Sequence, residues 1–432
     1  MTEEPKSAEV LAPLRAIEIV PISHQGRQVL LLRDPTGIAA EPLLISPASL
    51  KLLPFFDGRH TLRDIQLAAA RDTGQIIPSA QIDAFVAKLE ANHLLDSPGY
   101  QAFRTRLAEE YAGWPSRPAQ FAGRAYAPDA RALSEQLSSF YRLPGAPGLP
   151  PAPVAQAPAG IAAPHIDPLR GGKVYAHAYA QLWGAPVRAA VLLGVSHAGS
   201  VQPFVMTGKD YATPLGNLRT DREALAALTR RIDWDPCAEE DLHRWEHSIE
   251  FQLIFLQHAL ACGREEPRDG TVKILPILCS FSWEDLIPAE EDSRRERIDA
   301  FLAGLAAVLQ EAGHPWLLIA GVDLAHVGPR FGDEEPLSAR LLAETHRRDQ
   351  ATLASLAAGD REGFVAQLAR EGNDRRICGL PALYALATLL GGSRGRLLAY
   401  DQSVEPAVGS LVSFGALVFQ GGTGPAAGEA EG

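Results

Sequence analysis

Short apolar runs alternate with amphipathic segments along most of this chain, and the alternation restricts its fold more than any other feature. Six runs between residues 117 and 420 are short and apolar: residues 160–163, 187–194, 272–278, 316–320, 396–400 and 411–418. Helix-like segments occupy residues 129–141, 221–231, 247–261, 294–311, 339–356 and 381–390. Strands that alternate with helices predict an α/β domain with a largely parallel sheet and flanking helices.

Composition excludes several classes of protein. The chain has 432 residues with a net charge of −12, which argues against nucleic acid or an anionic membrane as its partner. No apolar stretch reaches the ~18 residues of a membrane span, and the acidic start MTEEPKSAEV is unlike a secretory signal. The four cysteines include no CxxC pair. We therefore expect a cytoplasmic protein of two or three domains.

Proline and glycine mark the expected domain boundaries. Residues 143–160 contain six Pro, three Gly and five Ala, a composition that favours an extended loop. This loop belongs to a linker and lead-in at residues 101–160, between a small unit at 1–100 and an α/β domain at 117–420. Residues 421–432 are expected to form a flexible tail.

Residues 1–100 predict a winged-helix-like α+β domain. Two β-rich runs, 17–22 and 27–33, precede three short helices, of which the first two begin after Ser46 and Thr61. Nine Lys and Arg stand against twelve Asp and Glu, so the unit lacks the positive charge of a DNA reader. In the segments LIS, FDGRHTL and NHLL it resembles PqqD-like modules, which bind leader peptides. The resemblance implies a peptide or protein partner, whereas a packing or dimerisation role is the alternative.

Three apolar runs are each followed closely by a histidine. His165 follows the run at 160–163, His197 the run at 187–194, and His326 the run at 316–320, with Asp323 between. Ligands of parallel sheets bind beyond the carboxyl ends of the strands, and imidazole binds metals and transfers protons. A single such histidine is usually a capping or core residue, but three in equivalent places favour a metal or catalytic site.

Two further segments carry candidate site residues. His247 and Glu250 share one face at the start of a helix, where acid could orient the imidazole or merely favour the helix dipole. Cys378 precedes another helix, where the dipole favours the thiolate. A buried, inert cysteine is the alternative, and it fits Cys237, Cys262 and Cys279 better.

The order of these motifs resembles the Memo-like family, protein B of the AmmeMemoRadiSam system. The matching segments are FAGRAYAPD, APHID, LGVSHAG, YATPLGNLRTD, WEHSIEFQL, GVDLAHVGPRF, ICGLPAL and YDQS. The family implies a fold like that of class III extradiol dioxygenases and a metal site of two His and one Cys. By position these ligands are His165, His197 and Cys378. Asp323 and His326 would line the pocket, either as proton-transfer groups or as groups that hold the ligands in place, with His247 nearby.

This ligand set predicts a non-haem iron oxidoreductase that acts on an unknown substrate, such as a peptide. Two imidazoles and one anionic ligand suit Fe(II), and the soft thiolate also admits copper. The family implies radical-SAM and AMMECR1-like partners. Asp167 adds a carboxylate beside His165, and its role is left open. The competing hypothesis is a non-catalytic metal- or peptide-binding adaptor.

Overall fold

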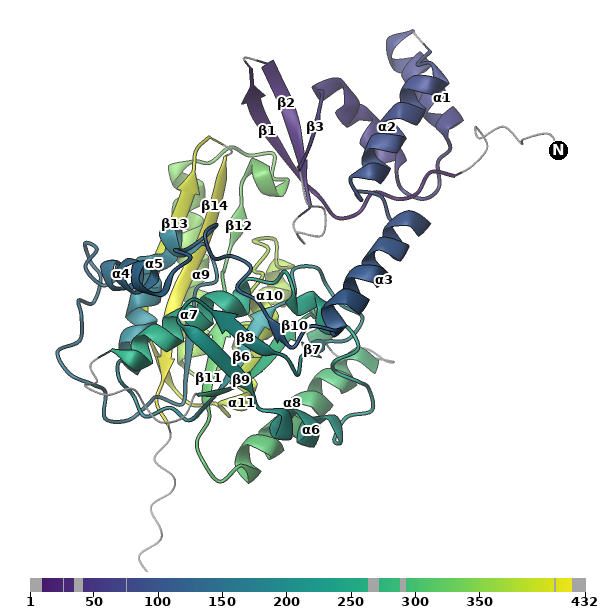
Figure 1. The fold of residues 1–432 in the computed structure, drawn as a ribbon. Helices are drawn as coiled ribbons and strands as arrows, with labels where there is room; N and C mark the ends of the chain where they lie inside the picture. Colours follow the sequence, from purple (N-terminus) through teal and green to yellow (C-terminus); the bar gives the residue numbers. More distant parts are fainter. Residues whose placement is uncertain are drawn as a thin grey trace, which may run out of the picture. The chain divides into compact units, whose positions relative to one another are not determined.

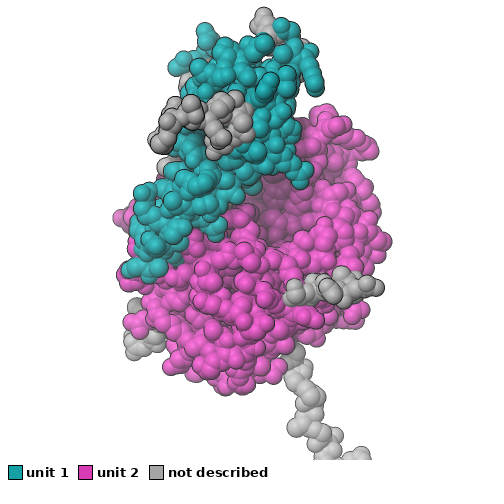
Figure 2. Space-filling view, turned by 90° about the vertical axis from the view of Figure 1, so that its right-hand side faces the viewer, with its two compact units in different colours: residues 1–113 teal, residues 114–432 magenta. Residues whose placement is uncertain are grey.

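A computed structural model describes residues 10–25, 27–34, 42–74, 76–262, 272–287, 293–407 and 409–421. The chain divides into two units, residues 1–113 and 114–432, which Figure 2 colours separately. Helix α3 (Pro98–Ala112) crosses the boundary expected at residue 100, so the first unit ends at Gly113. Apart from Gly421, the expected tail lies outside the described residues. Within the described ranges, no helix is both long and apolar enough for a membrane crossing.

The first unit combines a small antiparallel sheet with helices. Its strands are β1 (Glu18–His24), β2 (Arg27–Arg33) and β3 (Leu43–Ile45), in that order. Helices α1 (Leu62–Thr73) and α2 (Ser79–Ala91) follow, and leucine, isoleucine and phenylalanine side chains from strands and helices form one core. The winged-helix assignment of this α+β unit stays a prediction.

The helix starts predicted in this unit are present, but one helix is of a different kind. Thr61 caps α1 through a reciprocal pair of bonds with Asp64. Ser46 also caps the segment that follows it, yet residues Pro47–Phe55 form a 3₁₀ helix. Pro54 lies inside this segment and has no N–H for an α-helical hydrogen bond, which favours the shorter helix.

The second unit is built on a mixed sheet whose centre is parallel (Figure 1). The central strands run parallel in the order β5, β11, β6, β10 and β9. Their bounds are Gly160–Ala163, Leu317–Gly321, Ala189–Val195, Lys273–Cys279 and Gly216–Thr220. The largely parallel α/β sheet predicted from the sequence is therefore confirmed.

Shorter or antiparallel strands complete this sheet at both edges. Beyond β5 lie β14 (Ser410–Phe419), β13 (Gly395–Glu405) and β12 (His326–Val327), all antiparallel to their neighbours. Beyond β10 lie β7 (Phe204–Met206), β8 (Asp210–Thr213) and β4 (Ser116–Arg117). The expected strands at 396–400 and 411–418 correspond to β13 and β14.

Helices cover both faces of the sheet, because alternate side chains of each central strand point to opposite layers. In β6, Ala190 and Leu192 pack in one core, and Val191 and Leu193 pack in the other. Helices α4 (Ala130–Phe140), α5 (Pro168–Tyr179) and α7 (Ser248–Ala261) contribute to the first core. Helices α6 (Arg222–Thr229), α8 (Ser293–Glu311), α9 (Ala339–Ala357), α10 (Arg361–Glu371) and α11 (Leu380–Leu389) contribute to the second.

The first turn of α7 lies directly against the carboxyl ends of two central strands. A Cβ on Gly321 of β11 would be 2.5 Å from the Ser248 carbonyl oxygen and 2.7 Å from Gln252 Nε2. A Cβ on Gly194 of β6 would be 2.6 Å from Ser248 Oγ. The two glycines therefore allow the start of α7 to approach the strand ends closely.

We predict that Gly321→Ala lowers the free energy of unfolding by about 1–3 kcal/mol, because the added methyl group must displace α7 from the sheet. Gly208→Ala is the matched control, since its Cβ would meet its nearest neighbour, Leu225 Cδ2, at 3.7 Å. Urea unfolding measures both variants. Equal stability of Gly321→Ala and the wild-type protein would contradict this packing.

Candidate metal centre

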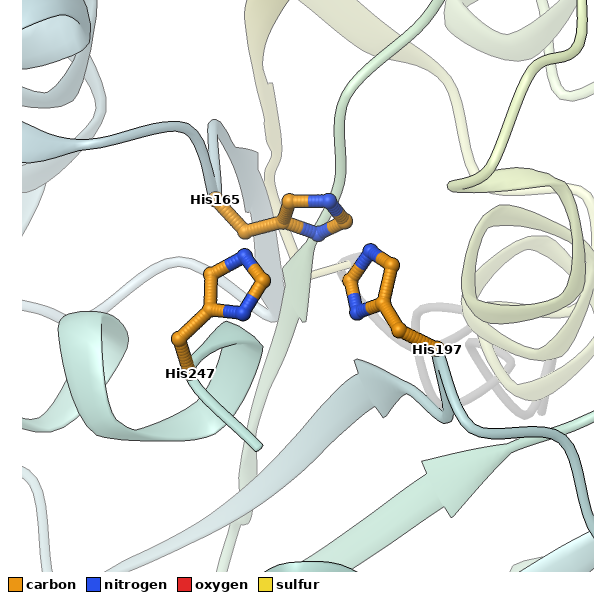
Figure 3. A group of neighbouring side chains, drawn as sticks. All are labelled: His165, His197 and His247. Carbon is orange, nitrogen blue, oxygen red and sulfur yellow. The ribbon is translucent and has the colours of Figure 1, made fainter. Parts of the chain in front are cut away.

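Residues that follow three strand ends converge at one edge of the central sheet. His165 lies two residues after β5, His197 two residues after β6, and Asp323 two residues after β11. His247 lies at the start of α7. Figure 3 shows the imidazoles of His165, His197 and His247 facing one another, with one nitrogen of each ring within 4.8 Å of the others. The sheet and α7 thus form a three-histidine cluster that could bind a metal ion.

Hydrogen bonding fixes which nitrogen of His165 faces the centre. The buried ring places Nδ1 2.9 Å from the Gly321 carbonyl oxygen. A carbonyl only accepts, so Nδ1 donates this bond and Nε2 is the nitrogen that faces the centre. Cys378 Sγ lies 3.2 Å from that Nε2. The structure therefore brings the predicted ligands His165 and Cys378 together.

Glu246 orients the other two imidazoles. Its carboxylate oxygens lie 3.0 Å from His197 Nδ1 and 3.3 Å from His247 Nδ1, and they accept the main-chain N–H groups of His197 (3.1 Å) and Ser248 (2.8 Å). Burial raises the pKa of Glu246, but the two imidazoles and these bonds hold it well below its ordinary value. The Nε2 atoms of His197 and His247 are consequently left for the centre.

The two imidazoles that share Glu246 have opposite pKa shifts. Burial lowers the pKa of His197, but Glu246 and Cys378 outweigh it and raise the pKa well above its ordinary value. Burial lowers the pKa of His247 to about 3, with His197 and His165 adding to the effect. His247 is therefore neutral at physiological pH, the form in which imidazole binds a metal, and its low pKa makes it a weak proton acceptor.

Cys378 is positioned by a strained turn and by its imidazole neighbours. Arg376 has a φ of 53°, a left-handed conformation that arginine rarely adopts. Its guanidinium holds this turn by donating to the His326 carbonyl (3.2 Å) and to Asp333 (2.6 Å). Burial raises the pKa of the Cys378 thiol, but His165 and His197 lower it to about 7. The thiolate is thus accessible near neutral pH.

Asp323 and His326 have separate surroundings. Asp323 Oδ1 accepts the main-chain N–H groups of His165 (3.0 Å) and Ile166 (3.1 Å), and burial raises its pKa to about 6. The resemblance implies that both residues line the pocket, but neither is among the lining residues of the pocket described below. In the structure the His326 ring donates from Nδ1 to the Leu324 carbonyl (3.1 Å), and Asp323 acts on it through its charge. Burial lowers the pKa of His326.

Two acidic residues near the histidines serve the fold. Glu250 is fully buried, forms an ion pair with Arg117 and accepts two main-chain N–H groups. Arg117 also donates to the Glu246 carbonyl (2.7 Å), so the pair supports the segment that carries Glu246. Asp167 accepts from the Leu169 N–H (2.8 Å) as the cap of α5. The sequence left the roles of both acids open, and in the structure Glu250 pairs with Arg117 while Asp167 caps α5.

A pocket of about 490 Å³ opens beside two of the predicted ligands. Its lining includes His197, Cys378, Ser196, Ser280, Phe281, Ser282, Asp285, Arg294, Asn373 and Pro381. The Arg294 guanidinium lies 3.4 Å from the Asp285 carboxylate, so these two charges balance within the lining. The pocket offers a mixed polar and apolar surface next to the thiol, with room for a small molecule or a side chain.

Comparisons with known proteins match most of the chain. Residues 117–418 match the family described as "Memo-like protein". A MEMO1 family protein of Aquifex aeolicus is 29% identical over 397 residues, which cover 90% of this chain and 95% of that relative. A MEMO1 family protein of Thermus thermophilus is 30% identical over 367 residues, covering 84% of this chain and 99% of the relative. The two matches leave 10% and 16% of the chain uncovered. Residues 1–113 make up about a quarter of the chain, so both matches extend into them.

We predict that Cys378 of the metal-free protein reacts with iodoacetamide half-maximally near pH 7, because only the thiolate attacks and its pKa is about 7. Below that pH the rate should fall about tenfold per unit. Cys237 and Cys262 are internal controls: burial raises the pKa of both, to about 12 for Cys237. His165→Phe should move the midpoint to higher pH. Mass spectrometry of each cysteine-containing peptide measures the rates, and a wild-type midpoint near pH 9 would contradict the prediction.

Proposed function

This chain belongs to the Memo-like protein family, and from that premise we propose that it is a metal-dependent oxidoreductase of the cytoplasm. In this proposal His165, His197 and Cys378 hold a divalent metal ion, and the substrate binds in the adjoining pocket. The observation that carries it is the 3.2 Å approach of Cys378 Sγ to His165 Nε2, at the point toward which His197 is also directed.

The donor set fits Fe(II) first and copper second. His165 and His197 have their Nδ1 atoms engaged with a carbonyl and a carboxylate, the outer-shell arrangement that raises ligand basicity. The Cys378 thiol ionises readily and supplies the anionic ligand. A ferrous ion held by two imidazoles and one anion would keep open positions for dioxygen and substrate, and a thiolate also suits Cu(I).

We assign the proton-transfer role to His326. It is not among the residues that line the pocket, so the reacting part of the substrate would have to extend beyond that lining. His326 donates from Nδ1 to the Leu324 carbonyl, so its Nε2 is the acceptor and would serve as the general base or acid. His247 is neutral and faces His165 and His197, so it adds no charge to the site. Asp323 holds the His165 main chain through two N–H groups.

A second candidate function is metal binding without catalysis, and one observation favours it. His247 lies with His165 and His197 in a group whose donor atoms are within 4.8 Å of one another, while Cys378 Sγ lies 3.2 Å from His165 Nε2 and would be the fourth donor. Four protein ligands around one ion would form a closed, tetrahedral site of the structural type, with no position for substrate. The two functions therefore differ in whether His247 binds the metal.

We expect His165→Ala and Cys378→Ser each to weaken Fe(II) binding at least tenfold, because each removes a ligand. Cys262→Ser is the control and should keep full iron content, as should His326→Ala. Anaerobic reconstitution followed by plasma mass spectrometry measures iron per chain. Full iron content in both ligand variants would overturn the proposed site.

Nitric oxide tests whether the site is open. The reconstituted wild-type protein should give the paramagnetic resonance signal of a ferrous nitrosyl, since an oxidoreductase needs a free position on the metal. A protein that keeps its iron but gives no such signal, and gains it in His247→Ala, would instead support the closed binding site. Once a substrate is found, His326→Ala should abolish substrate-dependent oxygen uptake.

The first unit provides a candidate partner site. β1 and β3 are the outer strands of its described sheet, and a peptide strand can add to such an edge through main-chain bonds. We propose that this unit recruits a peptide or protein of the modification pathway that the family's radical-SAM and AMMECR1-like partners imply.

A chain lacking residues 1–113 should lose peptide binding, while its iron content stays unchanged. Pull-down of partners on the full and shortened chains, followed by calorimetry with the peptide identified, measures this. Equal binding of that peptide by the shortened chain would contradict the proposed role of the first unit.

A further inference from the structure

A buried charge pair behind the candidate centre has no part in the proposed chemistry. Asp349 on α9 is fully buried and Arg375 is 2% exposed, and the two form an ion pair. Asp349 also accepts hydrogen bonds from the hydroxyl groups of Ser413 (2.6 Å) and Tyr400 (2.8 Å). Buried ion pairs add little net stability, because both charges must leave water. Stability alone therefore does not account for this pair.

One arm of the network reaches the loop that follows β11. Ser413 Oγ donates to Asp349 and accepts the N–H of Ala325 (2.9 Å). Main-chain bonds join the same segments, from Leu324 N to the Ser413 carbonyl (2.7 Å) and from Ser413 N to the Ala325 carbonyl (3.0 Å). The Asp349 carboxylate thereby fixes residues 322–326, which carry the two predicted proton-transfer residues.

The other arm reaches the loop that carries the thiol. Arg375 lies three residues before Cys378, and its guanidinium is bound by Asp349 and by Glu371 (2.8 Å). The Arg375 carbonyl accepts the N–H of His326 (2.7 Å). Fixing Arg375 thus fixes the end of the Cys378 loop against the His326 loop.

We propose that Asp349 is a positioning residue of the metal centre. By binding both Ser413 and Arg375, it sets the spacing between the two loops. It thereby keeps the Cys378 thiol close enough to His165 for both to bind one metal ion. The Gly379 N–H bond to the Asp323 carbonyl (3.1 Å) joins the same two loops at their other end. This role rests on the proposed function, because it concerns the geometry of that metal site.

Asp349→Leu combined with Arg375→Met tests the proposal, because it removes both charges and leaves neither buried alone. The full chain is titrated with Co(II) under anaerobic conditions, and two quantities are measured: the affinity, and the thiolate-to-Co(II) charge-transfer absorption per bound ion. We expect the affinity to fall about 10- to 100-fold and the absorption to weaken. Ser413→Ala severs one arm only and should give a smaller loss of both.

Arg231→Met combined with Glu311→Leu is the matched control, because this ion pair joins the end of α6 to α8 and contacts neither loop. It should leave both quantities unchanged. Wild-type affinity and absorption in the Asp349→Leu, Arg375→Met protein would overturn the positioning role while leaving the proposed function standing. If that protein fails to fold, unchanged values in Ser413→Ala overturn the role. If the wild-type protein shows no thiolate-to-Co(II) absorption, both the positioning role and the proposed function are overturned.

Discussion

The candidate centre depends on the contacts of the Glu246 carboxylate with His197 and His247. This carboxylate is buried, accepts from His197 Nδ1 and lies 3.3 Å from His247 Nδ1, so the Nδ1 side of both rings faces the carboxylate and the other nitrogen faces the centre. A buried charge is stable only when its partners replace the lost water. Here the replacements are the imidazoles of His197 and His247 and two main-chain N–H groups. Glu246 also joins the β6 loop to the start of α7, two segments about fifty residues apart in the chain.

The remaining geometry follows from the parallel sheet. Strands β5, β6 and β11 run in one direction, so the residues after their carboxyl ends meet at one edge. Gly194 and Gly321 then allow α7 to add His247 to the same edge. Two buried ion pairs support the loops from either side: Arg117 with Glu250 beneath Glu246, and Asp349 with Arg375 behind Cys378. In the proposed centre these charge pairs, which contribute little net stability, would hold the loops in place.

Sequence patterns predicted the central strands β5, β6, β10 and β11 and the strand-end histidines, because both depend on local periodicity and direction. They missed β9, whose residues GNLRT are mostly polar. Other features depend on contacts that the chain pattern does not encode. The GlyGly pair of α5 disfavours a helix locally, yet Gly172 is required because a Cβ there would meet the Phe140 ring at 2.5 Å. Glu246 was visible as an acid beside His247, but its bond to His197 spans 49 positions. Glu250 shares a helical face with His247, and only the fold shows that Glu250 forms an ion pair with Arg117.

In the proposed centre a sulfur atom and imidazole nitrogens meet around one ion. X-ray absorption spectroscopy at the metal edge of the iron-loaded protein tests this claim most directly. We expect one sulfur neighbour at about 2.3 Å together with nitrogen or oxygen neighbours at about 2.0–2.2 Å, distances typical of thiolate and imidazole ligands to a divalent ion. A first shell of nitrogen and oxygen alone would remove Cys378 from the centre and contradict the ligand set.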